Sequence, residues 1–132
     1  MDESRPIFVQ IAEQIENDIL DGVLAEESQV PSTNEFAAFY RINPATAGKG
    51  VNLLVESDVL YKKRGIGMFV RAGSRALLVA QRREQFQDEF VRPLVAEAAK
   101  LGISAEELTR MITHTPAVDS PTAGITGTEQ VI

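Results

Sequence analysis

Cationic side chains and glycines gather in one short stretch near the middle of the chain. Lys62, Lys63 and Arg64 run directly into the tripeptide Gly65-Ile66-Gly67. Three cations beside a tight turn suit contact with nucleic-acid phosphates, along the backbone or at a minor-groove edge. A basic patch alone is more often a solvated face, so the neighbouring elements decide what this one does.

Small and polar residues that could contact DNA precede this stretch, in residues 44–57. Ala45 and Gly48 are small enough to let a helix backbone approach a groove floor, and Lys49 could reach a guanine edge or a phosphate. Asn52 lies one helical turn further on and could contact adenine. Thr46 and the amides at the start of a helix could bind a phosphate, because free N–H groups and the helix dipole point outward there.

Residues for catalysis or metal binding are scarce. His114 is the only histidine, no carboxylate cluster lies near it in the sequence, and the chain has no cysteine. A Ser–His or Cys–His nucleophile, a thiolate metal site and a disulfide framework are therefore excluded. We expect no enzyme activity, no metal and no cofactor, and a cytoplasmic protein without a membrane span.

Charge is distributed unevenly along the chain. The formal net charge is −6, but residues 1–40 carry one arginine against nine carboxylates, whereas residues 41–71 carry six cations against two carboxylates. The local field, not the total charge, decides whether DNA is attracted, so a cationic segment in an acidic protein is compatible with DNA binding.

Hydrophobic periodicity and capping residues predict the elements that position these side chains. Residues 7–21 form an amphipathic helix with isoleucine every fourth residue. The sequence Ser32-Thr33-Asn34-Glu35 is a capping box that opens a helix over 33–40, and Asn43-Pro44 opens another over 44–57. Strands at 60–64 and 68–71 flank the glycine turn and form a hairpin.

Two glycines interrupt the helix predicted over 44–57. Glycine costs about 1 kcal/mol relative to alanine inside a helix, so each needs a reason. We favour close approach to DNA for Gly48. For Gly50, close packing against DNA or the 33–40 helix and simple tolerance are equally good explanations.

The second half of the chain is predicted to be helical. Ser74 could cap a long helix over 75–100, in which Pro93 should cause a kink or break near 89–92. A second capping box, Ser104-Ala105-Glu106-Glu107, opens a helix over 105–113, and residues 114–132 are predicted to be a disordered tail. An apolar stripe along these helices must be buried somewhere, either against a second copy, which we prefer, or on the chain's own N-terminal part. The predicted dimerisation residues are Phe86, Phe90, Leu94, Leu101, Leu108 and Met111.

A short extended piece is also expected around Gln29 and Val30. The order helix, strand, helix, helix and hairpin is that of a winged helix-turn-helix, with 44–57 as the recognition helix. Over roughly residues 6–71, the sequence resembles the GntR-type winged-helix regulators. The matching segments are Pro6-Ile7-Phe8-Val9-Gln10-Ile11, Val30-Pro31-Ser32, Phe36-Ala37, Asn43-Pro44-Ala45-Thr46 and Arg64-Gly65-Ile66-Gly67-Met68-Phe69-Val70. The Asn-Pro-x-Thr motif and the short C-terminal part look most like the YtrA subfamily, in which two helices replace a larger effector domain.

The resemblance implies DNA contacts at Ser32 and Asn34, at the start of the recognition helix, at Lys49 and at the wing tip. The start of that helix comprises Asn43, Ala45, Thr46 and Gly48. The chain departs from the family where Asn34 replaces a usual arginine, and where Asn43-Pro44 replaces Ser-Arg. Gly48-Lys49-Gly50 stands where Ser-Lys-Ala is common in the subfamily. Base preference should therefore differ from that of the wider family.

The expected protein is mainly α with a small β-hairpin: a DNA-binding domain over 1–73, a two-helix dimerisation appendage over 74–113 and the tail. It would bind a two-fold double-stranded operator as a homodimer, with wing 60–71 on the minor groove or backbone, and act as a repressor. Two alternatives stay open. One is a regulator that responds to a small effector at the dimer seam, and the other is a winged helix whose basic hairpin docks an acidic protein.

Overall fold

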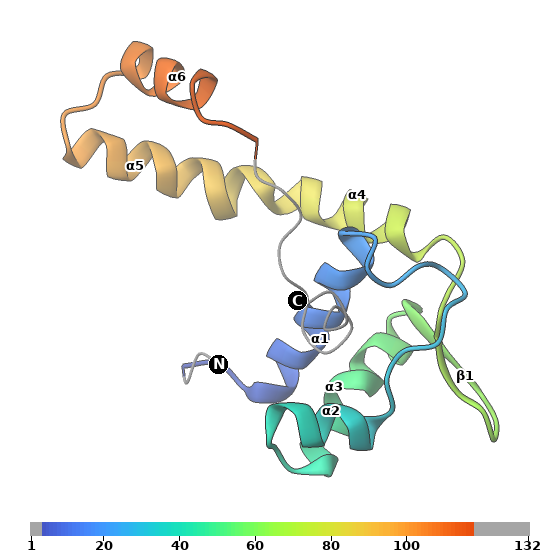
Figure 1. Ribbon diagram of the computed structural model, residues 1–132. Helices are drawn as coiled ribbons and strands as arrows, with labels where there is room; N and C mark the ends of the chain where they lie inside the picture. Colours follow the sequence, from blue (N-terminus) through green and yellow to red (C-terminus); the bar gives the residue numbers. More distant parts are fainter. Residues whose placement is uncertain (1–3, 118–132) are drawn as a thin grey trace. The chain divides into compact units, whose positions relative to one another are not determined.

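In the computed structural model, the described residues are 4–117, and they divide into two compact units at Leu78 (Figure 1). The N-terminal unit contains α1 (Ile7–Leu20), α2 (Thr33–Tyr40), α3 (Pro44–Glu56), β1 (Leu60–Lys63), β2 (Gly67–Val70) and the start of α4 (Ser74–Phe86). The C-terminal unit contains the rest of α4, the π-helical turn η1 (Gln87–Val91), α5 (Arg92–Lys100) and α6 (Ala105–Thr113). The mainly helical architecture with one antiparallel hairpin confirms the predicted fold class. Of the predicted tail, residues 118–132 lie outside the described residues. His114 and Thr115, which were predicted to be disordered, instead donate from their amides to the carbonyls of Arg110 and Ile112 at the end of α6.

Side-chain caps fix the start of both helices of the helix-turn-helix. The Ser32 hydroxyl accepts a hydrogen bond from the Glu35 amide at 3.1 Å, and the Glu35 carboxylate accepts one from the Ser32 amide at 2.7 Å. This is the predicted capping box, and it satisfies two amides at the start of α2. Asn43 caps α3 in the same way, through a 2.7 Å bond from the Ala45 amide to its Oδ1.

The core of the N-terminal unit lies where α1, α2 and α3 meet the hairpin. Ile11, Ile15 and Ile19 of α1 are buried, as the four-residue spacing predicts. Ile7 of the same stripe is exposed, because the first turn of α1 extends past the core. The other main core residues are Phe36, Ala47, Val51, Leu54, Val59, Leu60 and Val70.

A short segment, 27–30, lies along the free edge of β2. Its backbone bonds to β2 are Glu27 N–H to the Val70 carbonyl at 2.7 Å, and Val30 N–H to the Met68 carbonyl and Val70 N–H to the Ser28 carbonyl, both at 2.9 Å. Gln29 also forms an antiparallel bridge with Phe69. The hairpin, in which Leu60 pairs with Val70 and Lys63 with Gly67, is therefore supported on its β2 side by this segment.

The start of α4 differs from the prediction. Ser74 is not a cap: it is the first residue of the helix, its side chain is buried, and its hydroxyl has no hydrogen-bond partner. The Glu26 carboxylate instead accepts a 3.1 Å bond from the Arg75 amide. Bonds from the backbone amides of Gly73 and Arg75 lower the pKa of Glu26. From the sequence, Glu26 and Glu27 were expected to form only a solvated acidic loop, because the helix that Glu26 caps begins far away in the chain.

Pro93 perturbs the long helix that was predicted over residues 75–100, but it does not break it. The predicted disruption near 89–92 takes the form of the π-helical turn η1, and the residues on both sides of that turn keep right-handed helical dihedrals. Proline has no N–H to donate to the carbonyl four residues earlier, and a π turn is one way for the preceding backbone to adapt.

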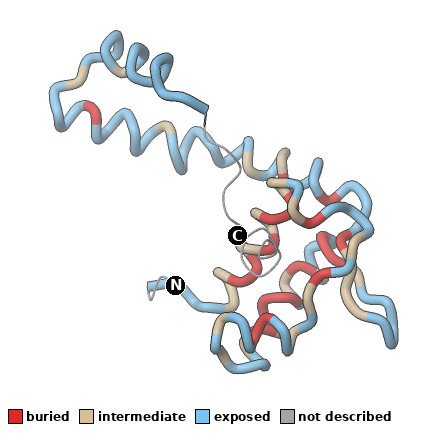
Figure 2. Tube along the Cα trace, in the orientation of Figure 1, coloured by how far each residue is buried: buried red, intermediate tan, exposed pale blue. Residues whose placement is uncertain are grey.

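Burial differs sharply between the two units. Figure 2 shows the buried positions gathered in the N-terminal unit. Among the described residues after Leu78, only Ala98 is buried, with 6% of its surface exposed. The C-terminal helices therefore carry their large apolar side chains on the surface. None of the helices in residues 4–117 is long and apolar enough for a bilayer crossing.

Candidate nucleic-acid interface

One side of α3 is exposed while the other side supplies the core. Ala45, Lys49 and Asn52 are exposed, whereas Ala47 and Val51 are buried. Thr46 and Gly48 are half-buried at the margin. This division leaves the predicted contact face accessible.

The first amides of α3 are already bonded inside the chain. The Ala45 amide donates to Asn43 Oδ1, and the Thr46 and Ala47 amides donate to the Asn43 carbonyl at 2.9 and 3.1 Å. A phosphate at this helix start would therefore be bound through side chains such as the Thr46 hydroxyl, or by displacing the Asn43 cap.

Lys49 has a partner that the sequence analysis missed. Its Nζ lies 4.5 Å from the ring centroid of Phe8, at the start of α1. An aromatic face attracts an ammonium group by its quadrupole, and this holds the lysine over the ring without removing its three donors. Phe8 therefore orients Lys49 at the exposed face of α3.

The two glycines of α3 have different surroundings. A Cβ on Gly50 would lie 2.6 Å from the Phe8 carbonyl oxygen and 3.0 Å from Ile11 Cβ, so glycine is required for close packing of α3 on α1. Simple tolerance is thereby excluded for Gly50, and its neighbour is α1 and not the 33–40 helix. A Cβ on Gly48 would meet only Thr33 Cγ2 at 3.6 Å, an ordinary contact, so internal packing does not explain that glycine.

The three cations of the hairpin are all exposed, but they do not share one face. Successive strand residues point to opposite sides, so Lys62 lies on the side of Leu60, whereas Lys63 lies on the side of Tyr61 and Phe69. Lys63 Nζ is 4.4 Å from the Phe69 ring centroid. Arg64 lies in the turn, which the Ile66 amide closes by donating to the Lys63 carbonyl at 2.9 Å.

Both glycines of the turn have positive φ, as predicted. Gly65 has φ 76° and Gly67 has φ 147°. Side chains with a Cβ rarely adopt these values, so the glycines allow the tight reversal that projects the hairpin tip away from the helices (Figure 1).

The predicted contacts at the start of α2 are also at the surface. Ser32 and Asn34 are exposed. The Ser32 oxygen accepts the capping bond from Glu35, which leaves its hydroxyl proton to donate. The N-terminal unit thus contains all the predicted DNA-contact residues. They lie at the start of α2, at the start and on the exposed face of α3, and on the hairpin.

An aromatic pair links the hairpin to segment 27–30. The Tyr61 and Phe69 rings stack across the strands with centroids 6.0 Å apart. The Tyr61 hydroxyl donates to the Glu27 carboxylate, and this bond raises the pKa of the phenol above its ordinary value of 10.0. Glu27 is therefore a structural partner of the hairpin, not only a solvated acid.

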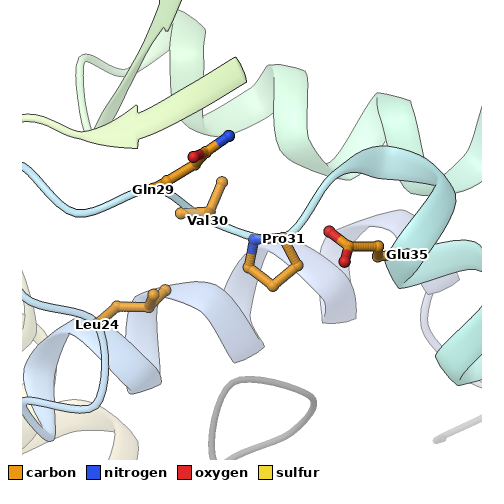
Figure 3. A pocket seen from close by; sticks show the side chains of 5 residues that line it. All are labelled: Leu24, Gln29, Val30, Pro31 and Glu35. Carbon is orange, nitrogen blue, oxygen red and sulfur yellow. The ribbon is translucent and has the colours of Figure 1, made fainter. Parts of the chain in front are cut away.

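An open pocket of about 410 Å³ lies beside the start of α2 (Figure 3). It is lined by Leu24, Gln29, Val30, Pro31 and Glu35. Both polar side chains are engaged elsewhere, since Glu35 completes the capping box and the Gln29 amide bonds to the Ile66 carbonyl. Figure 3 shows the Gln29 side chain pointing away from Leu24 and Pro31. The residues that line the pocket therefore lack the converging polar groups that are typical of ligand sites.

The predicted dimerisation residues lie mostly at the surface of the C-terminal unit. Leu108 is half-buried, and the other five are exposed: Phe86, Phe90, Leu94, Leu101 and Met111. The rings of Phe86 and Phe90 contact each other with centroids 5.6 Å apart. Val95 and Ile112, which were not among the predicted set, are exposed as well.

Comparison with known proteins gives consistent matches. The family model "Bacterial regulatory proteins, gntR family" matches residues 8–70. A solved structure of a GntR-family transcriptional regulator from Bacteroides thetaiotaomicron is 38% identical, with a TM-score of 0.62, over 81% of this chain and 93% of that one.

Two regulators from Bacillus subtilis (strain 168) are similar over both units. The HTH-type transcriptional regulator YhcF is 27% identical over 80% of this chain and 85% of its own length. The HTH-type transcriptional repressor YtrA is 26% identical over 80% of each. These relatives are transcription regulators and not enzymes, and their extent fits the YtrA-like type with its short C-terminal part. Together with the winged helix-turn-helix described above, the matches show that this chain is a DNA-binding transcriptional regulator of the GntR family.

Proposed function

We propose that the chain is a repressor that binds a two-fold operator as a homodimer, with α3 in the major groove and the hairpin on the minor groove or backbone. The observation that carries this proposal is the exposed face of α3 with Lys49 at its centre, in the same compact unit as the cationic hairpin. Repression is taken from the name of YtrA, the similar B. subtilis protein.

The homodimer is supported by the poor burial of the C-terminal unit. A helix pair whose only buried residue is Ala98 has almost no core of its own, while Phe90 keeps 60% of its surface exposed. Apolar side chains arranged along one face of a helix pair are stabilised when another surface removes them from water. A second copy supplies a self-complementary surface, and a two-fold dimer matches two half-sites about 34 Å apart.

Selection of duplexes from a random pool, followed by binding measurements, tests the proposal. Lys49→Ala should weaken binding to the selected duplex by about 1–3 kcal/mol if Lys49 contacts a base. Lys100→Ala removes the same charge from the C-terminal unit and should leave affinity nearly unchanged. Equal effects of the two changes would remove Lys49 from the interface.

The salt dependence of binding tests the hairpin. Changing Lys62, Lys63 and Arg64 together to alanine should reduce the slope of log affinity against log salt by about 0.9 for each phosphate contact that is lost. A slope equal to that of the wild type would place the hairpin outside the interface. Failure of the unmodified chain to bind any duplex would instead favour an acidic protein as the partner of the hairpin.

A further inference from the structure

The tip of the hairpin presents an apolar side chain among cations. Ile66 has 62% of its surface exposed and directly follows Arg64 and Gly65. Because Ile66 lies at the end of the hairpin, its side chain is placed to contact whatever molecule the hairpin binds.

Gln29 holds this tip from outside the hairpin. Its Nε2 donates a 3.0 Å hydrogen bond to the Ile66 carbonyl, across 37 residues of sequence. The backbone on each side of Gln29 is fixed to β2 by bonds from the Val30 amide to the Met68 carbonyl and from the Val70 amide to the Ser28 carbonyl. The side chain thus spans from an anchored backbone to the otherwise freely projecting turn.

Gly67 leaves the space that this contact needs. A Cβ at this position would lie 2.5 Å from Gln29 Nε2, so any side chain there would displace the amide. The glycine therefore serves the Gln29 contact as well as the turn itself.

The cations around the tip suit a narrow groove. Lys62 and Lys63 lie on opposite faces of the hairpin, so a ribbon that enters a groove would direct one toward each phosphate wall. The minor groove of B-DNA is about 6 Å wide, whereas the major groove, about 12 Å wide, is filled by an α-helix. Apolar side chains that enter the minor groove contact sugars and base edges, and the guanine amino group obstructs them there.

We propose that Gln29 is a positioning residue that fixes the hairpin tip so that Ile66 enters the minor groove of the operator beside α3, which gives the protein a preference for A·T pairs at that position. This inference rests on the proposed function, and it names two residues that set specificity outside the recognition helix. Gln29 acts through Ile66 and does not itself contact the DNA.

A double-mutant cycle on the selected duplex tests the positioning role. Ile66→Ala should weaken binding about tenfold and Gln29→Ala about fivefold, within the range that single specificity contacts show. In the Ile66→Ala background, the effect of Gln29→Ala should fall below about twofold, since neighbours that share one contact are not additive. Independent, multiplying effects of the two changes would overturn the positioning role.

Gln10→Ala is the matched control for Gln29→Ala. Gln10 Nε2 also donates a 3.0 Å bond to a backbone carbonyl, that of Arg5, away from the hairpin. Thermal unfolding of both variants should show similar small changes, whereas only Gln29→Ala should lose DNA affinity. Equal losses of affinity would indicate a merely structural role for Gln29 and would overturn the proposal.

Base-pair substitution tests entry into the minor groove. At the pair beneath the hairpin, located by its loss of preference in Ile66→Ala, A·T is replaced by inosine·cytosine or by G·C. Inosine·cytosine keeps the minor groove free of the amino group, so wild-type affinity should persist there and fall several-fold on G·C. Equal losses on both duplexes would place Ile66 elsewhere. If the wild-type chain binds no duplex at all, the proposed function itself has failed; if it binds and only these variants are neutral, this inference alone has failed.

Discussion

The two units of the chain use apolar residues in opposite ways. The N-terminal unit buries a cluster of fifteen apolar residues contributed by α1, α2, α3, the start of α4, the hairpin and the segment before α2. In the described part of the C-terminal unit, only Ala98 is buried, whereas Phe86, Phe90 and Leu94 are exposed. Burial of apolar surface is the main favourable term in folding, so the first unit is stabilised by its own core, whereas the second, in the homodimer that we propose, is stabilised by the surface of a second copy.

The contrast between the two units can be tested at the exposed apolar face of the C-terminal unit. Phe90→Glu should weaken dimerisation at least a hundredfold, because it places a carboxylate at the centre of the proposed seam. Sedimentation measures the change, and circular dichroism should show loss of helix from the C-terminal unit. Gln85→Glu adds the same charge at an exposed polar residue of α4 and should leave the dimer intact. A persistent Phe90→Glu dimer would show that the seam lies elsewhere.

Substitutions at the two glycines of α3 test how closely α3 packs on α1 in the N-terminal core. Gly50→Ala should reduce the free energy of unfolding by about 1–3 kcal/mol, because the new methyl group meets the Phe8 carbonyl and Ile11. Gly48→Ala should raise it by about 0.5–1 kcal/mol, because alanine favours the helix and the site has room. Chemical denaturation measures both. Equal effects would contradict the close packing of α3 on α1.

The helix caps compare the units directly. Ser32→Ala and Ser104→Ala each remove a hydroxyl that accepts from an amide three residues later, so each should cost about 1 kcal/mol. The loss from Ser32→Ala should appear in the unfolding of the N-terminal unit at any protein concentration. The loss from Ser104→Ala should depend on protein concentration if α6 is part of the proposed dimer, because dissociation then accompanies unfolding. Concentration-independent melting in both variants would argue against this coupling.

The smallest effect concerns the support of the hairpin. Tyr61 should ionise above pH 10.0, and Glu27→Gln should shift its titration downward, as followed by tyrosinate absorbance in a Tyr40→Phe background. Since its pKa is higher in the folded than in the unfolded chain, Tyr61 stabilises the fold at pH below 10.0, and this contribution is lost as the pH rises through the folded pKa. An identical titration in Glu27→Gln would show that the Glu27 carboxylate does not contact the Tyr61 hydroxyl.

Local signals predicted most of the fold. The capping box at Ser32, the Asn43-Pro44 start and the glycine turn act through neighbours within a few residues, so the helices and strands were placed within one or two residues of their ends. The fold class followed from the order of these elements, and the family resemblance followed from the sequence motifs that they carry.

Contacts between distant segments were not predictable in the same way. Glu26 at the start of α4, Phe8 under Lys49 and Gln29 at the hairpin tip each join residues that only the folded chain brings together. Periodicity and capping rules carry no information about such pairs. The position of the disruption at Pro93 was predicted, but its form was not. A kink and a π turn are both ways for a helix to accommodate the missing N–H group of proline.

The π-helical turn at Gln87–Val91 makes the length of this helix critical. Each residue advances an α-helix by about 100°, so a one-residue deletion there would rotate α5 by that angle relative to the preceding turns. Phe86 and Leu94 would then no longer share one side of the helix. In the proposed homodimer, insertions and deletions at this turn should therefore weaken pairing even when they leave every apolar residue in place.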